Sequence, residues 1–96
     1  MTIKQLNSDE KRVKIFKALA EIKRIEILRY LYRDKNIHTC GDIEKSIGVN
    51  KSNHSYHLKI LLEADLIDVK RHGQYKIITI KENIFHEFLP GFLATL

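Results

Sequence analysis

Residues that interrupt regular structure are scarce in this chain. Its 96 residues include one proline and four glycines, so each of these is expected to mark a turn or the end of an element. Cys40 is the only cysteine, which excludes an intrachain disulfide and fits a reducing compartment. Repeats, linkers and low-complexity segments are also missing, so residues 1–96 are expected to form a single domain.

Long apolar segments are absent as well. No run approaches the ~20 apolar residues that a membrane-spanning helix needs, and residues 1–5 lack the apolar stretch of a signal peptide. We therefore expect a cytoplasmic protein that has no membrane partner.

The sequence also lacks the motifs of catalysis. It has no glycine-rich phosphate loop, no nucleophile with a matching base, and no paired carboxylates at motif spacing. An enzyme is not expected, and nothing in the sequence calls for a cofactor.

The composition is that of an ordinary globular protein. Hydrophobic residues make up 44% of the chain and charged residues 30%, which argues against disorder. A domain of this size buries only a modest core, so oligomerisation is expected.

Positive charge is concentrated away from the C-terminal end. The net charge is +5, yet residues 82–96 carry two acidic and no basic side chains. Residues 49–81 carry six basic and three acidic side chains, and no acid lies between Glu44 and Glu63. Such a distribution favours nucleic acid or another acidic partner.

Helical spacing and capping residues predict the N-terminal half. A first helix is expected from an N-cap at Ser8, and a second over residues 22–32. Thr39 and Asp42 have the spacing of a capping box that opens a third helix. Gly48 is expected to end that helix with a positive φ.

A fourth helix is expected over residues 51–64, after a short turn at Val49 and Asn50. Its apolar face should consist of His54, Leu58, Leu61 and Leu62. Two helices joined by such a turn, the second rich in hydrogen-bond donors, form the helix-turn-helix arrangement. The side chains expected to contact DNA bases or phosphates are Lys51, Ser52, Asn53, Ser55, Tyr56, His57 and Lys59.

Two alternating segments follow, around His72-Gly73-Gln74, and they predict a hairpin. Residues 69–78 would form a basic wing in which Arg71 and Lys76 contact the DNA backbone or minor groove. The order of a basic polar helix and a basic hairpin suits a domain that lies against duplex DNA. The alternative to DNA contact is that the basic residues of the helix and wing only face solvent. On the same alternative, Ser52, Asn53 and Ser55 only cap the helix or face solvent.

The last segment has apolar residues at the spacing of an amphipathic helix, interrupted by Pro90-Gly91. Proline removes a helical hydrogen bond and clashes with the preceding turn, so the helix should kink or stop there. The residues beyond it are expected to pack loosely or on a partner. The apolar positions are Phe85, Phe88, Leu89, Phe92, Leu93 and Leu96.

Two stretches resemble the ArsR/SmtB family of bacterial repressors. Residues 19–28 resemble the family's "LA-x-x-x-R-x-x-IL" opening, and residues 47–61 resemble its recognition segment with Ser-x-His-Leu at 55–58. The resemblance covers residues 13–80, with Asp65 standing where the family has glycine. It implies a homodimeric, mostly α winged helix-turn-helix repressor of about five helices plus the wing. Family dimers form through the first and last helices, which here offer Val13, Phe16, Phe85, Phe88, Leu89 and Phe92.

Metal sensing is common in that family, but this sequence lacks the ligands. Of the family's cysteine-rich motif only Cys40 and Asp42 remain, and the last helix offers only Glu82, His86 and Glu87. Zinc and soft metals need more ligands than these, so no metal site is expected. Cys40 is expected to be a small buried residue, and the alternative is a metal- or redox-responsive repressor that uses it. The effector, whether a small molecule or an oxidant, is open.

The two histidines of the fourth helix, His54 and His57, are expected to have different roles. His54 is expected to be a hydrogen-bonded core residue. His57 matches the family's histidine, and it either supports the helix or contacts a phosphate. The rival to DNA binding is a protein-interaction module on the same scaffold, because fold does not fix function.

Overall fold

The computed structural model describes residues 7–96. Residues 1–6, which include the segment considered for a signal peptide, lie outside the described residues. The helices are α1 (Ser8–Leu19), α2 (Ile22–Arg33), α3 (Cys40–Ile47), α4 (Lys51–Glu63) and α5 (Glu82–Phe88), with a 3-10 turn η1 (Leu93–Thr95); the strands are β1 (His38–Thr39), β2 (Ile67–His72) and β3 (Tyr75–Ile80). The expected fold class, a winged helix-turn-helix of five helices and a hairpin, is confirmed.

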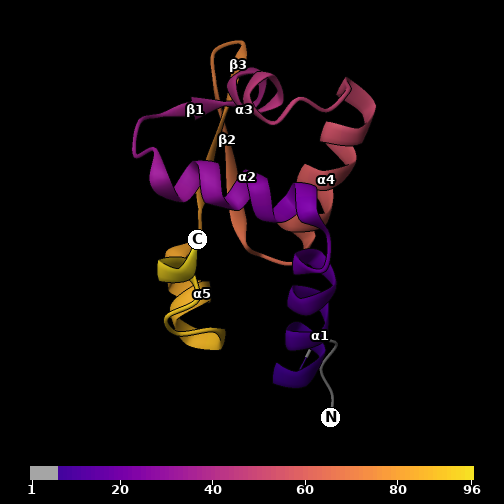
Figure 1. Ribbon diagram of the computed structural model, residues 1–96, viewed down its shortest axis with the longest axis vertical. Helices are drawn as coiled ribbons and strands as arrows, with labels where there is room; N and C mark the ends of the chain where they lie inside the picture. Colours follow the sequence, from indigo (N-terminus) through magenta and orange to yellow (C-terminus); the bar gives the residue numbers. More distant parts are fainter. Residues whose placement is uncertain (1–6) are drawn as a thin grey trace.

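Helix α2 crosses the middle of the molecule, with α1 and α5 below it on opposite sides and α3 and the hairpin tip above (Figure 1). The sheet is antiparallel with strand order β1-β3-β2. In the hairpin, Ile67 pairs with Ile80 at the base and His72 pairs with Tyr75 at the tip. Gly73 has a φ of 62°, which this tight turn requires.

Local capping sets the ends of the first and third helices. The first helix is capped one residue earlier than expected, by Asn7, whose Oδ1 accepts from the Glu10 N–H at 2.8 Å. The Ser8 prediction was wrong because Asn7, unlike Ser8, has a glutamate at the third helical position to complete a capping box. The predicted Thr39–Asp42 box and the Gly48 stop, with a φ of 76°, are both confirmed.

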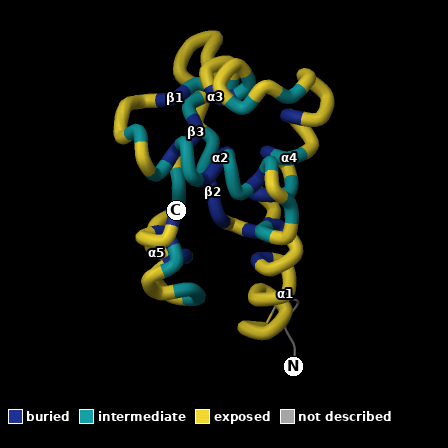
Figure 2. The backbone as a smooth tube through the Cα atoms, viewed as in Figure 1, coloured by how far each residue is buried: buried dark blue, intermediate teal, exposed yellow. Residues whose placement is uncertain are grey.

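One core joins the two halves of the chain. Buried residues line the inner sides of α2, α3 and α4 and the base of the hairpin, whereas the hairpin tip is exposed (Figure 2). Helix α1 has two apolar sides: Ile15 and Ala18 enter the core, and Val13 and Phe16 face solvent. Among the described residues no helix is long and apolar enough to cross a membrane.

The last α-helix ends before Pro90, as expected, but the residues that follow the proline pack against the chain's own core. Helix α5 ends at Phe88, and Leu93 and Leu96 are only 4% and 7% exposed. The ring of Phe92 stacks on Phe85 with centroids 5.9 Å apart. The expectation of loose packing was wrong because Gly91, at a φ of 87°, turns the chain back onto the core.

Candidate nucleic-acid interface

The turn between α3 and α4 is fixed by the side chain of Asn50. Its Oδ1 accepts from the Asn53 backbone N–H at 2.9 Å and from the Ser52 hydroxyl at 3.2 Å. Asn50 thus caps α4 and sets the direction in which that helix leaves the turn. Ser52 takes part in this cap, as the alternative reading of the serines allowed.

Helix α4 turns its donor-rich side outward. His54, Leu58 and Leu61 are buried, whereas Leu62, expected on the inner face, is 45% exposed. Leu62 differs because it lies at the edge of the buried stripe, beside the groove toward the hairpin. The predicted contact residues that the structure leaves exposed on this helix are Lys51, Ser52, Asn53, Ser55, Tyr56 and Lys59.

Two wing cations are held side by side. Arg71 and Lys76 are exposed and directly opposite each other in the β2–β3 register. Like charges at directly opposed positions repel, so an anion between or above them would relieve that repulsion. The pair is therefore suited to a phosphate.

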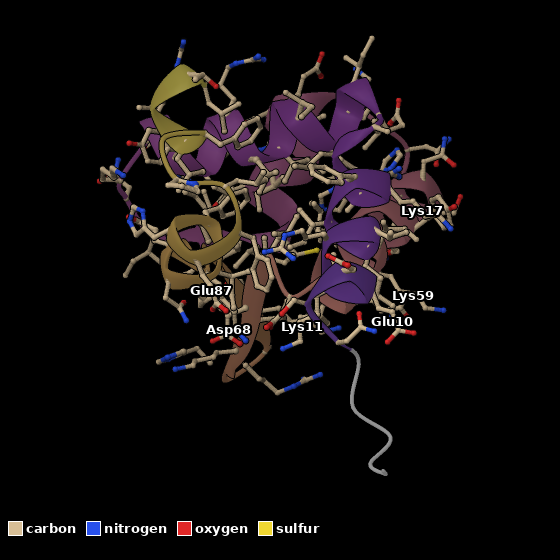
Figure 3. The ribbon with its side chains drawn as sticks, turned by 90° about the horizontal axis from the view of Figure 1, so that it is seen from below. Glu10, Lys11, Lys17, Lys59, Asp68 and Glu87 are labelled. Atoms are coloured by element: carbon tan, nitrogen blue, oxygen red, sulfur yellow. The ribbon has the colours of Figure 1, made fainter. Side chains whose placement is uncertain are left out.

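A groove of about 200 Å³ separates α4 from the hairpin. Lys59 of α4 and Lys76 of β3 both line it, with Leu58, Leu62 and Val69 among its apolar lining. Lys59 also projects from the surface when the molecule is seen from below (Figure 3). The groove brings the two predicted contact elements together in one basic surface.

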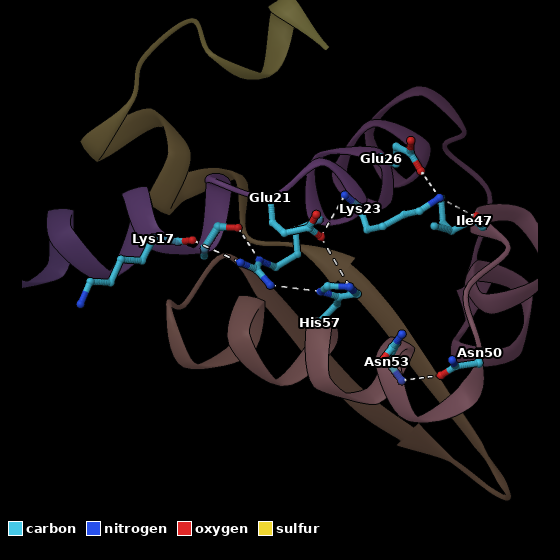
Figure 4. Close-up of polar contacts among 10 residues, drawn as sticks. Lys17, Glu21, Lys23, Glu26, Ile47, Asn50, Asn53 and His57 are labelled. Atoms are coloured by element: carbon cyan, nitrogen blue, oxygen red, sulfur yellow. Dashed lines mark hydrogen bonds and ion pairs between the residues drawn. The ribbon is translucent and has the colours of Figure 1, made fainter.

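His57 points inward, away from this surface. Its Nδ1 lies 3.0 Å from Arg24 Nη1, and its Nε2 lies 3.5 Å from Glu21 Oε1 (Figure 4). Of the two roles expected for His57, this geometry favours support of the helix over contact with a phosphate. The reason is that residue 57 falls on the side of α4 that faces the corner between α1 and α2.

Arg24 is the centre of that corner. It is only 8% exposed, and its Nε donates to the Ala18 carbonyl at 2.6 Å and its Nη2 to the Lys17 carbonyl at 3.3 Å. Both carbonyls belong to the last turn of α1, where a cation is favourable. Arg24 was matched to the family motif in the sequence, but pairing it with His57 needed the fold.

His54 and Cys40 join α4 to the start of α3. His54 is buried, and its Nε2 lies 3.1 Å from the Cys40 carbonyl, as expected of a hydrogen-bonded core histidine. Cys40 is half-buried; burial, with help from Glu44, raises the pKa of its thiol. Over residues 7–96, no three His, Cys, Asp or Glu side chains gather as a metal site would require.

The residues expected at the dimer surface divide into two groups. Val13 and Phe16 on α1 are 51% and 55% exposed, and Phe88, Leu89 and Phe92 are partly exposed. Phe85 is 1% exposed and lies in the chain's own core, so it has no surface left for a partner. Ile22, at 72% exposure, is an apolar surface residue that sequence reasoning missed, because its helical spacing with Ile25 and Leu28 is that of a residue facing the core.

Comparison with known proteins gives the class. Residues 23–70 match the family model of the helix-turn-helix domain. Over 96 residues the chain is 38% identical to the HTH-type transcriptional regulator YceK of Bacillus subtilis. The alignment covers 100% of this chain and 95% of that protein. The chain therefore belongs to the helix-turn-helix family of transcriptional regulators.

The chain also resembles an arsenical resistance repressor in sequence and ArsR-family domains in fold. It is 39% identical over 67 residues to the arsenical resistance operon repressor of Bacillus subtilis, covering 70% of this chain and 63% of that protein. The homodimeric winged helix-turn-helix DNA-binding domain from Mycobacterium bovis shares its fold, with a TM-score of 0.75 at 21% identity over 98% of this chain and 90% of that one. The predicted ArsR resemblance and the prediction of a DNA-binding transcriptional regulator are confirmed.

Proposed function

We propose that this protein is a homodimeric repressor that binds operator DNA with α4 in the major groove and the wing on the adjacent backbone. The observation that carries the proposal is the outward, acid-free side of α4, which continues across a groove into the Arg71–Lys76 pair. A regulator of this kind works where the chromosome lies, which supports a cytoplasmic location.

The proposed interface assigns two kinds of contact. Asn53 and Ser55, near the start of α4, have uncharged side chains suited to hydrogen bonding with base edges. Lys51, Lys59, Arg71 and Lys76 are suited to phosphates, which position the protein without reading sequence. Tyr56, 58% exposed, would lie against the DNA backbone.

Support for repression and for the dimer comes from the relatives. The arsenical resistance operon repressor and the transcriptional repressor SdpR of Bacillus subtilis are both repressors by name. The Mycobacterium bovis domain is homodimeric. On this chain, Val13 and Phe16 of α1 and Ile22 of α2 are exposed apolar side chains that a second copy could cover.

The test separates positioning from base reading. An operator is first selected from a random duplex library, and affinities for it and for a scrambled duplex are then measured by fluorescence anisotropy over a salt series. Arg71→Ala should weaken both duplexes alike and reduce the salt slope by about 0.9, the value for one phosphate contact. Asn53→Ala or Ser55→Ala should weaken the operator alone, by about 1–3 kcal/mol.

Lys35→Ala is the matched control, because Lys35 is exposed and lies over the Tyr32 ring in the α2–β1 connection. It should leave both affinities unchanged. Equal losses on both duplexes for Asn53→Ala and Ser55→Ala would refute the base-reading assignment. Failure of the wild type to bind any duplex at low salt would instead favour a protein-interaction module.

A further inference from the structure

The hydrogen bond between Arg24 and His57 defines the protonation state of the imidazole. A guanidinium carries only donors, so Nδ1 of His57 must be the acceptor in the 3.0 Å contact. The ring proton then resides on Nε2, which faces the Glu21 carboxylate at 3.5 Å. His57 is therefore a neutral imidazole that links α4 to the corner between α1 and α2.

This link depends on a proton. If Nδ1 gained a proton, two cationic donors would face each other and the buried Arg24 would lose an acceptor. Leaving a buried charged donor without its partner is unfavourable. His57 or the whole of α4 would then have to move away from Arg24, which is held in place by the Lys17 and Ala18 carbonyls.

We propose that neutral His57 is a positioning residue for the recognition helix, and that its protonation releases α4 from Arg24 and weakens operator binding. His57 itself makes no contact with DNA. It acts through the orientation of α4, which carries Asn53 and Ser55. The proposal rests on the DNA-binding function proposed above.

The surroundings of His57 favour the neutral form. Burial lowers the pKa of His57 below its ordinary value of 6.5, and Glu21 opposes that effect. The charged and titratable groups that face the imidazole are Glu21, Lys23, Arg24, His54 and Tyr56. His57 is thus held in its neutral form, and its protonation requires a more acidic solution than that of a free imidazole.

The sign of the pH effect distinguishes this role from a phosphate contact. Phosphates near an imidazole favour its protonated form, so a phosphate-binding histidine would bind DNA more tightly in acid. A positioning histidine weakens operator binding in acid, and by linkage operator binding must then lower the pKa of His57. If the pKa of His57 falls by one unit on binding, operator affinity at the acidic limit is about tenfold weaker.

The experiment measures operator and scrambled-duplex affinities from pH 7.5 to 5 at constant ionic strength. All proteins carry His72→Gln, so that no exposed imidazole remains at the wing tip beside the DNA. The expected result is loss of operator affinity in acid with no loss on the scrambled duplex. NMR titration of the His57 ring should show a lower pKa in the operator complex than in the free protein.

Two variants assign the effect to His57. His57→Asn keeps an acceptor near the Nδ1 position and cannot titrate, so operator affinity should stay near that of the parent at pH 7.5 and become flat with pH. Glu21→Gln removes the carboxylate that raises the pKa of His57, so the midpoint should move to lower pH. The glutamine can still accept from the Lys23 N–H, as the Glu21 cap does at 3.2 Å.

Each outcome decides the proposal. Tighter operator binding in acid, or acid loss that persists in His57→Asn, would overturn it. If His57→Asn does not fold, an unmoved midpoint in Glu21→Gln overturns it and a lowered midpoint supports it. A protein that binds no operator at pH 7.5 refutes the DNA-binding function itself, whereas binding without acid loss refutes only the role of His57.

Discussion

Asp65 is the one non-glycine residue among the described residues that has a positive φ, at 65°. It follows the C-cap of α4, where the ArsR resemblance has glycine. An L-residue in the left-handed region is strained, although aspartate tolerates it better than most. Its Oδ1 accepts from Lys81 Nζ at 2.6 Å, and this hydrogen bond raises the pKa of Lys81. Strain and ion pair therefore oppose each other at this residue.

Asp65→Gly and Asp65→Ala separate the two effects. Both remove the ion pair, but only alanine retains the backbone strain, so Asp65→Ala should be less stable than Asp65→Gly by about 1–2 kcal/mol. Chemical denaturation by urea measures the difference. Lys81→Ala removes the exposed pair alone and should change stability little. Equal stabilities of the two Asp65 variants would contradict a strained backbone.

Helix α3 depends on glycine at its end but not at its start. Gly48 has a φ of 76° and its N–H donates to the Glu44 carbonyl at 3.0 Å, which closes the last turn before α4 begins. Gly41 lies within the first turn of the same helix and is exposed. A Cβ at Gly48 would meet nothing within 4 Å, and one at Gly41 would meet only Thr39 Oγ1 at 3.8 Å. Neither position is limited by space.

The same substitution should therefore have opposite effects at the two positions. Gly48→Ala should destabilise the protein by about 1–2 kcal/mol, because alanine resists a positive φ. Gly41→Ala should stabilise it by about 0.4–1 kcal/mol, because it reduces the entropy of the unfolded chain. Thermal unfolding of the two variants checks the signs. A stabilising Gly48→Ala would show that the turn accepts another geometry.

Across the whole molecule, α1 exposes two large apolar side chains, and Ile22 and Ile37 are exposed on other segments. On α1, Val13 and Phe16 are left exposed, while Phe85 and the residues after Pro90 complete the core. In the N-terminal half of α1 the Arg12 guanidinium lies 5.4 Å from the centroid of the Phe88 ring, and this contact joins α1 to α5. This arrangement suits a second copy of the chain docked on α1.

Phe16→Glu should convert the dimer to a folded monomer. Placing an unpaired carboxylate in a buried interface costs about 3–5 kcal/mol, so light scattering should report a single chain at micromolar concentration. Operator affinity should fall with it, because one recognition helix remains where two were engaged. The matched control is Asn36→Glu, which adds the same charge at an exposed position in the α2–β1 connection.

Phe85→Ala, compared with Phe16→Glu, distinguishes a residue of the core from a residue of the dimer interface. Removing a buried phenylalanine should lower the free energy of unfolding by about 3–5 kcal/mol. Circular dichroism at equal concentration distinguishes this loss of fold from the folded monomer expected of Phe16→Glu. A Phe16→Glu protein that stays dimeric would place the interface elsewhere.

The sequence by itself determined the features that depend on neighbours along the chain. The Thr39–Asp42 box, the stop at Gly48, the hairpin turn at Gly73 and the break at Pro90 each involve a few successive residues, and their backbone geometry follows from local sterics and hydrogen bonds. They predicted the helix-turn-helix and the hairpin, and the resemblance to the ArsR/SmtB family implied the winged helix-turn-helix fold as a whole. The Asn7 cap was missed by one residue because adjacent Asn and Ser are both good caps.

Only the tertiary structure decided which way particular side chains face. Periodicity marks a face as apolar or polar, but it does not say what will cover that face. His57 became the partner of Arg24, 33 positions away, and Phe85 became core because the residues after Gly91 fold back over it. These contacts depend on how helices pack across long separations in the chain, and a one-dimensional pattern does not contain that information.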